Sequence, residues 1–214
     1  MATTHCPDGV LVIDDYLDRK TIEDLKYFSD GEIGIINKED FKLADGSMEI
    51  RKSEGLVSER IYTRKIQESA LSICDGVFGK VIPQHYDTRI EWYEYPHIIR
   101  YRKGGHYDPH ADADARKDEQ SSWYRNVERD FSAIIYFNDN FTGGTLFFPD
   151  YNYRLTPKPG MLVCFPSNHH YIHTAEPVIS GVRYAFVTWG AAYATERLFE
   201  KPRGDIVYLD RNKT

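Results

Sequence analysis

The chain has 214 residues, of which 41% are hydrophobic and 14% aromatic, and its formal net charge is −6. This composition argues against a disordered chain and allows a sizeable core, and the length favours one domain. Because proteins that bind duplex nucleic acid are more often basic, no nucleic-acid partner is expected.

The termini and the cysteines indicate a soluble protein. Cys6, Cys74 and Cys164 form no C-x-x-C pair, which argues against a zinc knuckle and against a disulfide framework. The first residues lack the basic region of a signal peptide, and no apolar run reaches the length of a membrane span. We therefore expect a cytoplasmic protein without a membrane span.

The first part of the chain predicts a strand, a helix and another strand. Residues 9–17 read as a short strand, and residues 31–36 are a further strand candidate. Between them, residues 18–28 continue a pattern with helical spacing. The apolar positions of that pattern are Leu17, Ile22, Leu25 and Phe28.

A polar segment and a second helix follow. Residues 37–59 carry many charges and turn residues and predict a long loop, which in a compact domain is usually functional or disordered. Residues 60–83 form an amphipathic stripe that predicts one helix, with Gly79 and Pro83 marking its end. Its apolar positions are Ile61, Ile66, Ala70, Leu71, Cys74 and Phe78.

After Pro83 the sequence predicts an antiparallel β core. Short segments rich in β-branched and aromatic residues alternate with turn signals, a pattern typical of a sandwich or jelly roll. The segments are residues 88–101, 131–138, 144–149, 151–157, 161–166, 170–179 and 182–190. We therefore expect a single α+β, mainly β, domain over residues 1–214. It consists of helical and strand support (about 1–83), a jelly-roll core (about 84–192) and a charged tail (about 193–214) with no predicted structure.

Near the start of this core lie two His-x-Asp triplets. His106 and Asp108 form one, and His110 and Asp112 form the other. Residues two apart on a strand share a face, so either pair could hold one metal ion. Two histidines and one carboxylate with open positions suit Fe(II) that must also bind oxygen and a co-substrate. The third ligand would come from a distant strand, where the candidates are His169, His170 and His173.

The residues alone leave the ligands unresolved. The segment could instead be an acidic edge strand, and the downstream histidines could be turn residues. Residues 106, 108, 110, 112 and 114 have the same parity, so an unbroken strand would show all of them on one face. Pro109 predicts a break in strand pairing there.

Four ordered motifs resemble those of prolyl 4-hydroxylases, which are Fe(II)- and 2-oxoglutarate-dependent dioxygenases. Residues 100–119 resemble the family pattern of a Tyr, Gly-Gly and x-Tyr-x-Pro-His-x-Asp. Residues 50–60 resemble its Arg-x-Ser-x-Gly loop, and residues 143–166 its Gly-Gly-x-x-x-Phe-Pro and Pro-Lys-x-Gly segment. Residues 173–189 resemble the segment that opens with the distal histidine. The resemblance covers roughly residues 50 to 190, and four motifs in order are a strong signal where each alone is weak.

The resemblance implies a metal site of His110, Asp112 and His173. In the family pattern the ligating triplet directly follows the Pro, and the distal ligand precedes a basic residue by ten positions, which here is Arg183. His106 then falls at a position without a metal role. His169 and His170 are left as turn residues near the site.

The resemblance also implies a co-substrate site and a reaction. Arg183 would pair with the 5-carboxylate of 2-oxoglutarate, although animal and plant prolyl 4-hydroxylases usually carry Lys there. Tyr101 matches a family tyrosine near the co-substrate, and it could equally be a core aromatic. The implied reaction hydroxylates a peptidyl proline with O2 and converts 2-oxoglutarate to succinate and CO2; ascorbate is a candidate reductant.

Substrate contacts are the least determined part of the resemblance. Arg51, Ser53 and Gly55 match a loop that covers peptide substrate in the family, but the segment could be a solvated loop; Trp189 matches an aromatic near the mouth, but could be a core residue. Two other hypotheses stay open at this point. The same chemistry could act on another protein side chain or a small molecule, or the chain could be a non-catalytic jelly-roll binding module with a relict metal site.

Overall fold

The structure is a computed structural model. It describes residues 6–36, 38–42, 48–52, 55–118, 120–193, 195–200 and 205–209, and for 38–42 and 48–52 it describes the backbone alone.

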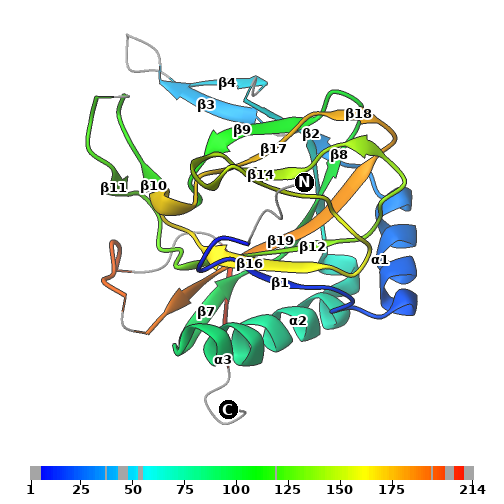
Figure 1. Cartoon of the computed structure of the whole chain (residues 1–214), viewed down its shortest axis with the longest axis horizontal. Coiled ribbons are helices and arrows are strands. Elements are labelled where there is room, and N and C mark those ends of the chain that lie inside the picture. Colours follow the sequence, from blue (N-terminus) through cyan, green and yellow to red (C-terminus); the bar gives the residue numbers. More distant parts are fainter. Residues whose placement is uncertain are drawn as a thin grey trace.

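Two antiparallel β-sheets face each other (Figure 1). The larger sheet has the strand order β1-β16-β12-β19-β8-β6-β2, and β7 and β20 extend it beside β19. Its strands are β1 (Leu11–Ile13), β2 (Ile35–Ile36), β6 (Glu59–Tyr62), β7 (Ile90–Glu94), β8 (His97–Tyr101), β12 (Phe131–Tyr136), β16 (Leu162–Pro166), β19 (Arg183–Ala192) and β20 (Ile206–Tyr208).

The smaller sheet has the order β15-β14-β17-β9-β5. Its strands are β5 (Leu56–Val57), β9 (His106–His110), β14 (Leu146–Phe148), β15 (Tyr153–Leu155) and β17 (His173–Ala175). Three two-stranded ladders lie outside the two sheets: β3 (Lys38–Lys42) with β4 (Met48–Lys52), β10 (Asp114–Ala115) with β11 (Tyr124–Arg125), and β13 (Thr142–Gly143) with β18 (Val178–Ser180). The predicted jelly-roll core is therefore confirmed.

Strand β19 separates two hydrophobic cores. Tyr184 and Phe186 point to the core under the helices, whereas Ala185 and Val187 point to the core between the two sheets. A strand buried on both faces has no polar face, which explains its near-continuous apolar sequence. Burial on both faces requires β-branched and aromatic residues at successive positions. This run of residues is the sequence pattern that predicted the strand.

The helices cover the outer face of the larger sheet (Figure 1). Helix α1 (Arg19–Gly31) begins at Asp18, whose side chain accepts a hydrogen bond from the Thr21 amide at 2.8 Å. This N-cap satisfies one of the amides that a helix start leaves without a partner. The predicted helix of residues 18–28 is confirmed, with its buried face at Ile22 and Leu25.

The second predicted helix, residues 60–83, is wrong in its bounds. Ile61 lies in strand β6, and α2 (Gln67–Gly76) begins later, after a 3-10 turn at Arg64–Ile66. A π-helical turn (Val77–Val81) contains Gly79 and leads into α3 (Ile82–Tyr86). Pro83 lies in the first turn of α3, where its missing N–H is tolerated, and therefore it does not end the helical region. The helical region ends at Asp87, which has a left-handed backbone conformation.

The long loop predicted over residues 37–59 is also wrong. Strands β3 and β4 pair from Lys38 opposite Lys52 to Lys42 opposite Met48, and β5 and β6 follow. The β3–β4 hairpin forms its own two-stranded ladder and joins neither large sheet. Backbone hydrogen bonds between its strands need no apolar run, so the charged sequence carried no strand signal.

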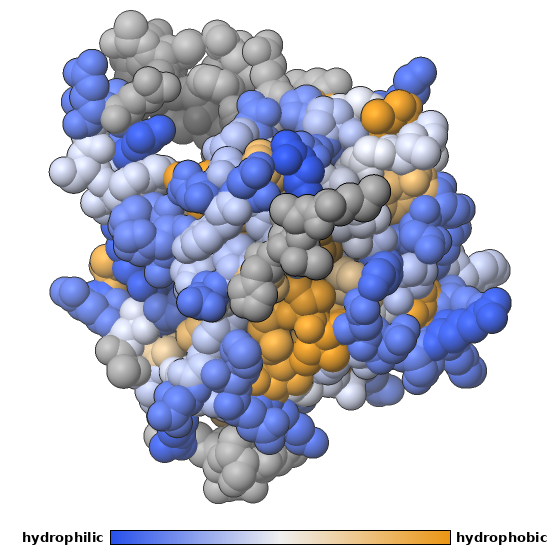
Figure 2. All heavy atoms as spheres, viewed as in Figure 1, coloured by the Kyte–Doolittle hydropathy of each residue, from blue (hydrophilic) through white to orange (hydrophobic). Residues whose placement is uncertain are grey.

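The remaining segments complete the surface. The charged tail, for which the sequence predicted no structure, adds β20 to the edge of the larger sheet beside β7. Further 3-10 turns are Pro149–Tyr151 and His169–Tyr171. Figure 2 shows one face as mostly hydrophilic, with a hydrophobic patch in the region of β1. Within the described residues, every helix is too short or too polar to cross a membrane.

Candidate metal centre

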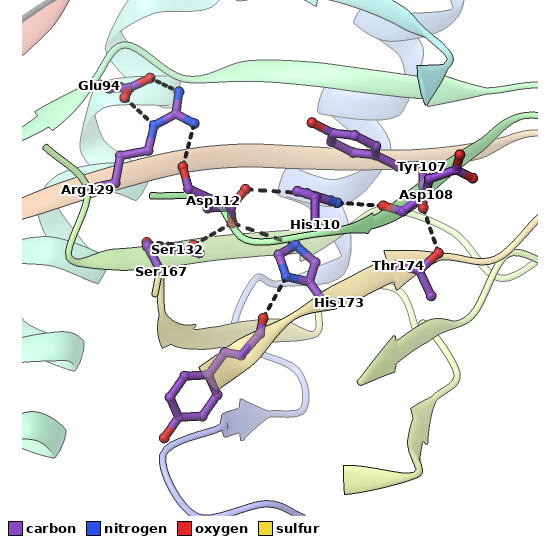
Figure 3. Close-up of polar contacts among 11 residues, drawn as sticks. Glu94, Tyr107, Asp108, His110, Asp112, Arg129, Ser132, Ser167, His173 and Thr174 are labelled. Carbon is purple, nitrogen blue, oxygen red and sulfur yellow. Dashed lines mark hydrogen bonds and ion pairs between the residues drawn. The ribbon is translucent and has the colours of Figure 1, made fainter. Parts of the chain in front are cut away.

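Strands β9 and β17 bring two histidines and an aspartate together. His110 and His173 are paired opposite each other across the two strands, and Asp112 lies just beyond the end of β9. One ligand atom from each residue lies within 4.8 Å of the others. His110 Nε2 is 3.5 Å from Asp112 Oδ1, and His173 Nε2 is 3.6 Å from Asp112 Oδ2 (Figure 3). This group offers two imidazole nitrogens and one carboxylate, the donor set of non-haem Fe(II) sites.

Backbone carbonyls hold the outer nitrogen of each ring. His110 Nδ1 lies 2.8 Å from the carbonyl oxygen of Asp108, and His173 Nδ1 lies 3.0 Å from that of Tyr171. A carbonyl only accepts, so each Nδ1 carries a proton, and Nε2 is the ring nitrogen that faces Asp112. Both rings are therefore held in the tautomer that binds metal through Nε2.

A shift in strand register explains why these residues meet. Ala175 is paired with Tyr107, whereas His173 is paired with His110, so β9 carries one extra residue between the two pairs. Pro109 lies in this irregular stretch, and the predicted break in pairing is confirmed. After the break, strand parity no longer places all five His and Asp residues on one face.

Three other histidines were metal-ligand candidates: His106, His169 and His170. Within the described part of the chain, none of them belongs to the His110–Asp112–His173 group. His106 sits opposite Val57 of β5. His169 Nδ1 lies 2.6 Å from Asp114 Oδ2, and its ring stacks on Trp123. His169 and His170 occupy a 3-10 turn ahead of β17, in agreement with their assignment as turn residues.

The electrostatics prepare the group for a cation. Burial alone would raise the pKa of the Asp112 carboxyl, but the neighbouring His173, His110 and Arg129 outweigh burial and lower it. Burial, together with the nearby His110, lowers the pKa of His173 to about 4. At neutral pH the carboxylate is therefore ionised and the His173 ring is neutral, the states in which both bind metal.

A buried arginine lines the same pocket. Arg183 lies opposite Tyr101 in the β19–β8 pairing and is 3% exposed. Its guanidinium carbon is 4.2 Å from the centre of the Tyr101 ring, and its Nη1 donates to the Gly144 carbonyl at 2.8 Å. Among the described residues, Arg183 forms no ion pair with a carboxylate, and its Nε has no hydrogen-bond partner.

A tyrosine hydroxyl beside Arg183 is also without a partner in the described part of the protein. It belongs to Tyr136, whose ring centre is 5.5 Å from the guanidinium carbon of Arg183. Burial raises the pKa of Tyr136 to about 12 and also raises that of Tyr101, so both phenols stay protonated. A buried guanidinium without a carboxylate partner and a buried hydroxyl without a hydrogen-bond partner both destabilise the fold. One bound carboxylate could interact with both groups.

The pocket therefore has a metal-binding end and an anion-binding end. His110, Asp112 and His173 line it together with Tyr101 and Arg183. Apolar side chains form the wall between and around them: Ile99, Leu146, Val187 and Ala185. A small molecule that chelates a metal at one end and carries a carboxylate at the other would fit this distribution of groups.

Sequence reasoning missed three residues that support the pocket. They are Tyr136 at the anion end, and Ser132 and Arg129, which contact Asp112. Ser132 and Tyr136 face the pocket side of β12 because they are paired with Trp189 and Ala185 of β19. Polar residues within a buried strand are an informative signal, and here that signal was available in residues 131–138.

The predicted substrate-binding residues are only partly described. The side chain of Arg51 and the whole of Ser53 lie outside the described residues. The Gly55 carbonyl accepts a hydrogen bond from the Asp108 amide at 2.7 Å, two residues from His110. Trp189 lines the pocket, and the Arg129 guanidinium lies 3.8 Å from the centre of its ring.

Comparison with known proteins supports this picture. Residues 96–190 match the model of the 2OG-Fe(II) oxygenase superfamily. A putative prolyl 4-hydroxylase of Acanthamoeba polyphaga mimivirus is 32% identical over 102 residues, which cover 43% of this chain and 42% of the relative. Human prolyl 3-hydroxylase 3 is 39% identical over 66 residues, which cover 28% of this chain and 9% of the relative.

A solved structure shows the same fold. The viral collagen prolyl hydroxylase of Paramecium Bursaria Chlorella virus-1, solved as a 2OG complex, aligns with a TM-score of 0.59 and 18% sequence identity. The alignment covers 86% of this chain and 97% of that chain. The matched region spans less than half the length of the curated relatives. The resemblance to prolyl hydroxylases drawn from the four motifs is confirmed.

Proposed function

We propose that this chain is an Fe(II)- and 2-oxoglutarate-dependent dioxygenase that hydroxylates a prolyl residue in a peptide or protein. One observation carries the proposal. A single pocket holds a His–Asp–His group and a buried arginine that has no carboxylate partner among the described residues. The superfamily match over residues 96–190 supports the same chemistry.

His110, Asp112 and His173 would hold the iron. Each residue offers one ligand atom to a common position, and both Nε2 atoms are already oriented by the carbonyls behind the rings. Three protein ligands leave the open positions that a co-substrate and O2 need. With iron and 2-oxoglutarate bound, the site supplies oxidative decarboxylation to succinate and CO2, coupled to insertion of one oxygen atom into a C–H bond.

Arg183 would pair with the 5-carboxylate of 2-oxoglutarate. Its guanidinium is fixed by the Gly144 carbonyl and the Tyr101 ring, and its Nε is left to donate. The protonated Tyr136 hydroxyl would add a second donor to the same carboxylate. A charge-assisted pair in a buried pocket is strong, and a carboxylate gives the arginine the partner that it lacks.

The apolar wall would keep water away from the reaction. Ile99, Leu146 and Val187 line the pocket between its metal end and its anion end. Exclusion of water strengthens the Arg183 interaction and limits side reactions of the bound co-substrate. The protein thus positions the metal and the co-substrate, supplies the charge that binds the co-substrate, and limits the access of water.

The substrate assignment rests on the relatives. Those matched in sequence are named as prolyl 4-hydroxylase and prolyl 3-hydroxylase, and the matched solved structure as a collagen prolyl hydroxylase. A prolyl substrate is common to all of them, while the hydroxylated carbon differs. We therefore propose prolyl hydroxylation, and we leave the ring position to the product analysis.

A matched peptide panel tests the substrate. The Fe(II)-loaded protein is incubated with 2-oxoglutarate and proline-containing peptides, with the same peptides carrying alanine for proline, and with free proline. We expect succinate formation and a mass gain of one oxygen atom only with the proline peptides, and amino-acid analysis then separates 3-hydroxyproline from 4-hydroxyproline. Equal turnover with the alanine peptides would assign the chemistry to another side chain or a small molecule.

A further inference from the structure

Asp112 is held by a chain of two serines that the reaction scheme does not use. The Ser132 Oγ lies 2.6 Å from Asp112 Oδ2, and the Ser167 Oγ lies 2.8 Å from the Ser132 Oγ (Figure 3). Both serines are 1% exposed. A pair of hydroxyls this deeply buried is fixed by its hydrogen bonds and not by water.

The direction of these hydrogen bonds follows from the ionised carboxylate. An ionised carboxylate only accepts, so the Ser132 hydroxyl must donate its proton to Asp112 Oδ2. Since that proton is committed, the Ser167 hydroxyl must donate to the Ser132 oxygen. The chain therefore runs from Ser167 to Ser132 to Asp112, and each bond polarises the next.

The backbone fixes both serines. Ser132 lies within β12, opposite Phe165 of β16 and Trp189 of β19. The Ser167 carbonyl accepts from the amide of Ala113, the residue after Asp112, at 2.8 Å. Ser132 is thus held within the larger sheet, and Ser167 is bonded to the backbone next to Asp112.

A third contact holds the backbone of Asp112. Arg129 Nη1 donates to the Asp112 carbonyl at 3.3 Å, and Glu94 holds the Arg129 guanidinium through two hydrogen bonds of 2.5 and 2.7 Å. Arg129 therefore fixes the main chain, and Ser132 fixes the carboxylate itself. Of the two, only the serine donates a hydrogen bond to the carboxylate that would bind metal.

We infer that Ser132, oriented by Ser167, is a positioning residue that presents the Asp112 carboxylate to the metal. With Oδ2 engaged by Ser132, the carboxylate is held with Oδ1 toward His110 and Oδ2 toward His173. A carboxylate that is free to rotate must lose that freedom when metal binds, and this loss of entropy weakens binding. This inference rests on the proposed metal centre and goes beyond its three ligands.

Titration with Co(II) alone, followed through its visible absorption, tests the inference without turnover. We expect Ser132→Ala to weaken Co(II) binding by about 10- to 100-fold and to change the spectrum of the bound ion, as is typical when a partner of a metal ligand is removed. Ser167→Ala should weaken binding by about two- to tenfold, the effect of one hydrogen bond. The double variant should bind no more weakly than Ser132→Ala, because Ser167 acts only through Ser132.

Ser29→Ala is the matched control. Ser29 is fully buried and donates to the Leu25 carbonyl at 2.7 Å inside α1, away from the pocket. Its removal should leave Co(II) affinity and the Co(II) spectrum as in the wild type. Denaturation midpoints of all variants separate a general loss of folding from a local loss of metal binding.

Two results would overturn the inference. One is a Ser132→Ala variant with wild-type Co(II) affinity and spectrum, and the other is a double variant whose loss equals the product of the single losses. Asp112→Ala distinguishes this failure from a failure of the proposed function. If Asp112→Ala also bound Co(II) as tightly as the wild type, the metal centre itself would be wrong.

Discussion

Arg183 is the residue on which co-substrate binding depends in this account. Its guanidinium is buried beside Tyr101 and Tyr136, and within the described residues it has no acidic partner. His110 and His173 lie on other strands, β9 and β17, and Asp112 follows β9. Loss of Arg183 should therefore separate 2-oxoglutarate binding from metal binding.

Arg183→Ala should lose 2-oxoglutarate and keep metal. Removing one partner of a buried charge pair costs about 3–5 kcal/mol, which corresponds to a loss of affinity of hundreds to thousands of fold. Arg183→Lys should lose less, because the charge remains. Separate titrations of Mn(II) and of 2-oxoglutarate into each variant measure the two effects.

Arg154→Ala is the control for that experiment. Arg154 is half-exposed and pairs with Glu176 at 3.1 Å, so its loss should leave 2-oxoglutarate affinity unchanged. Wild-type 2-oxoglutarate affinity in Arg183→Ala would contradict the assignment. The carboxylate site would then have to involve another basic residue.

The ligand assignment makes a second prediction at this scale. His110→Ala, Asp112→Ala and His173→Ala should each abolish turnover, because each removes one of three metal ligands. His106→Ala and His170→Ala should retain most of the wild-type rate, since the structure leaves both outside the group. Initial rates of succinate formation compare the five variants. An inactive His106→Ala variant together with an active His110→Ala variant would show that the choice of His110 and Asp112 as the ligand pair is wrong.

Individual residues were predictable only where a motif named them. Strand alternation could not choose between the two His-x-Asp triplets, because the irregular pairing at Pro109 changes which residues share a face. The resemblance chose His110, Asp112 and His173, and the structure brings those three together. Ser132 and Tyr136 carry no motif, and only the path of β12 beside β19 places them opposite Trp189 and Ala185, which line the pocket.

At the scale of elements, the β3–β4 hairpin and the segment after it form the candidate cover of the site. Residues 56–57 pair with Tyr107 and His106 of β9, ahead of His110 on the same strand, and the Gly55 carbonyl accepts a hydrogen bond from the Asp108 amide. The hairpin precedes this segment in the chain and stands apart from both large sheets. We propose that this segment contacts a peptide substrate.

Substitutions at Arg51, Ser53 and Gly55 should raise the KM for a peptide more than the KM for 2-oxoglutarate. The proposed contacts of this segment are with peptide, whereas 2-oxoglutarate depends on Arg183 inside the pocket. Steady-state kinetics with each substrate varied in turn measures the two constants. Arg19→Ala, a change at an exposed residue of α1, should alter neither. Equal increases in both constants would contradict a role in covering peptide.

The packing of the helices on β19 can be tested at Gly190. A Cβ at this position would lie 2.5 Å from Cδ1 and Cε1 of Phe78, a buried ring stacked on Tyr93. Gly190→Ala should therefore lower the free energy of unfolding by about 1–3 kcal/mol, the usual cost of overpacking. Urea denaturation measures this change.

Gly31→Ala provides the matched control for overpacking. A Cβ at Gly31 meets no atom within 4 Å, so this variant should unfold at the wild-type urea concentration or slightly above it. A Gly190→Ala protein as stable as Gly31→Ala would contradict the tight contact between β19 and the π-helical turn.

Elements were predictable where burial shaped their sequence. The central strands of the larger sheet lie between two cores and therefore read as apolar runs, as in residues 182–190. The β3–β4 hairpin pairs only with itself, so its sequence reads as a polar loop. The end of the second helical region was missed because a π-helical turn carries the chain past Gly79 and Pro83.

At the scale of the whole molecule, two facing sheets enclose the pocket and helices support it from behind. The metal ligands come from the smaller sheet and its end, and Arg183 comes from the larger sheet. The site therefore exists only when both sheets are assembled. The jelly-roll class could be predicted from the order of short strands, whereas the meeting of the metal ligands with Arg183 could be predicted only through the family resemblance, because it depends on long-range pairing.

The central claim is that this assembled pocket turns over 2-oxoglutarate with iron, and succinate formation under O2 tests it most directly. The metal-free protein, the protein with Fe(II) restored and His173→Ala with Fe(II) are compared at saturating 2-oxoglutarate and with the same proline-containing peptide. The account predicts succinate from the Fe(II)-restored wild type alone. Succinate formation that is equal with and without iron, or equal in His173→Ala, would contradict it, and its absence from all samples would favour a binding module without catalysis.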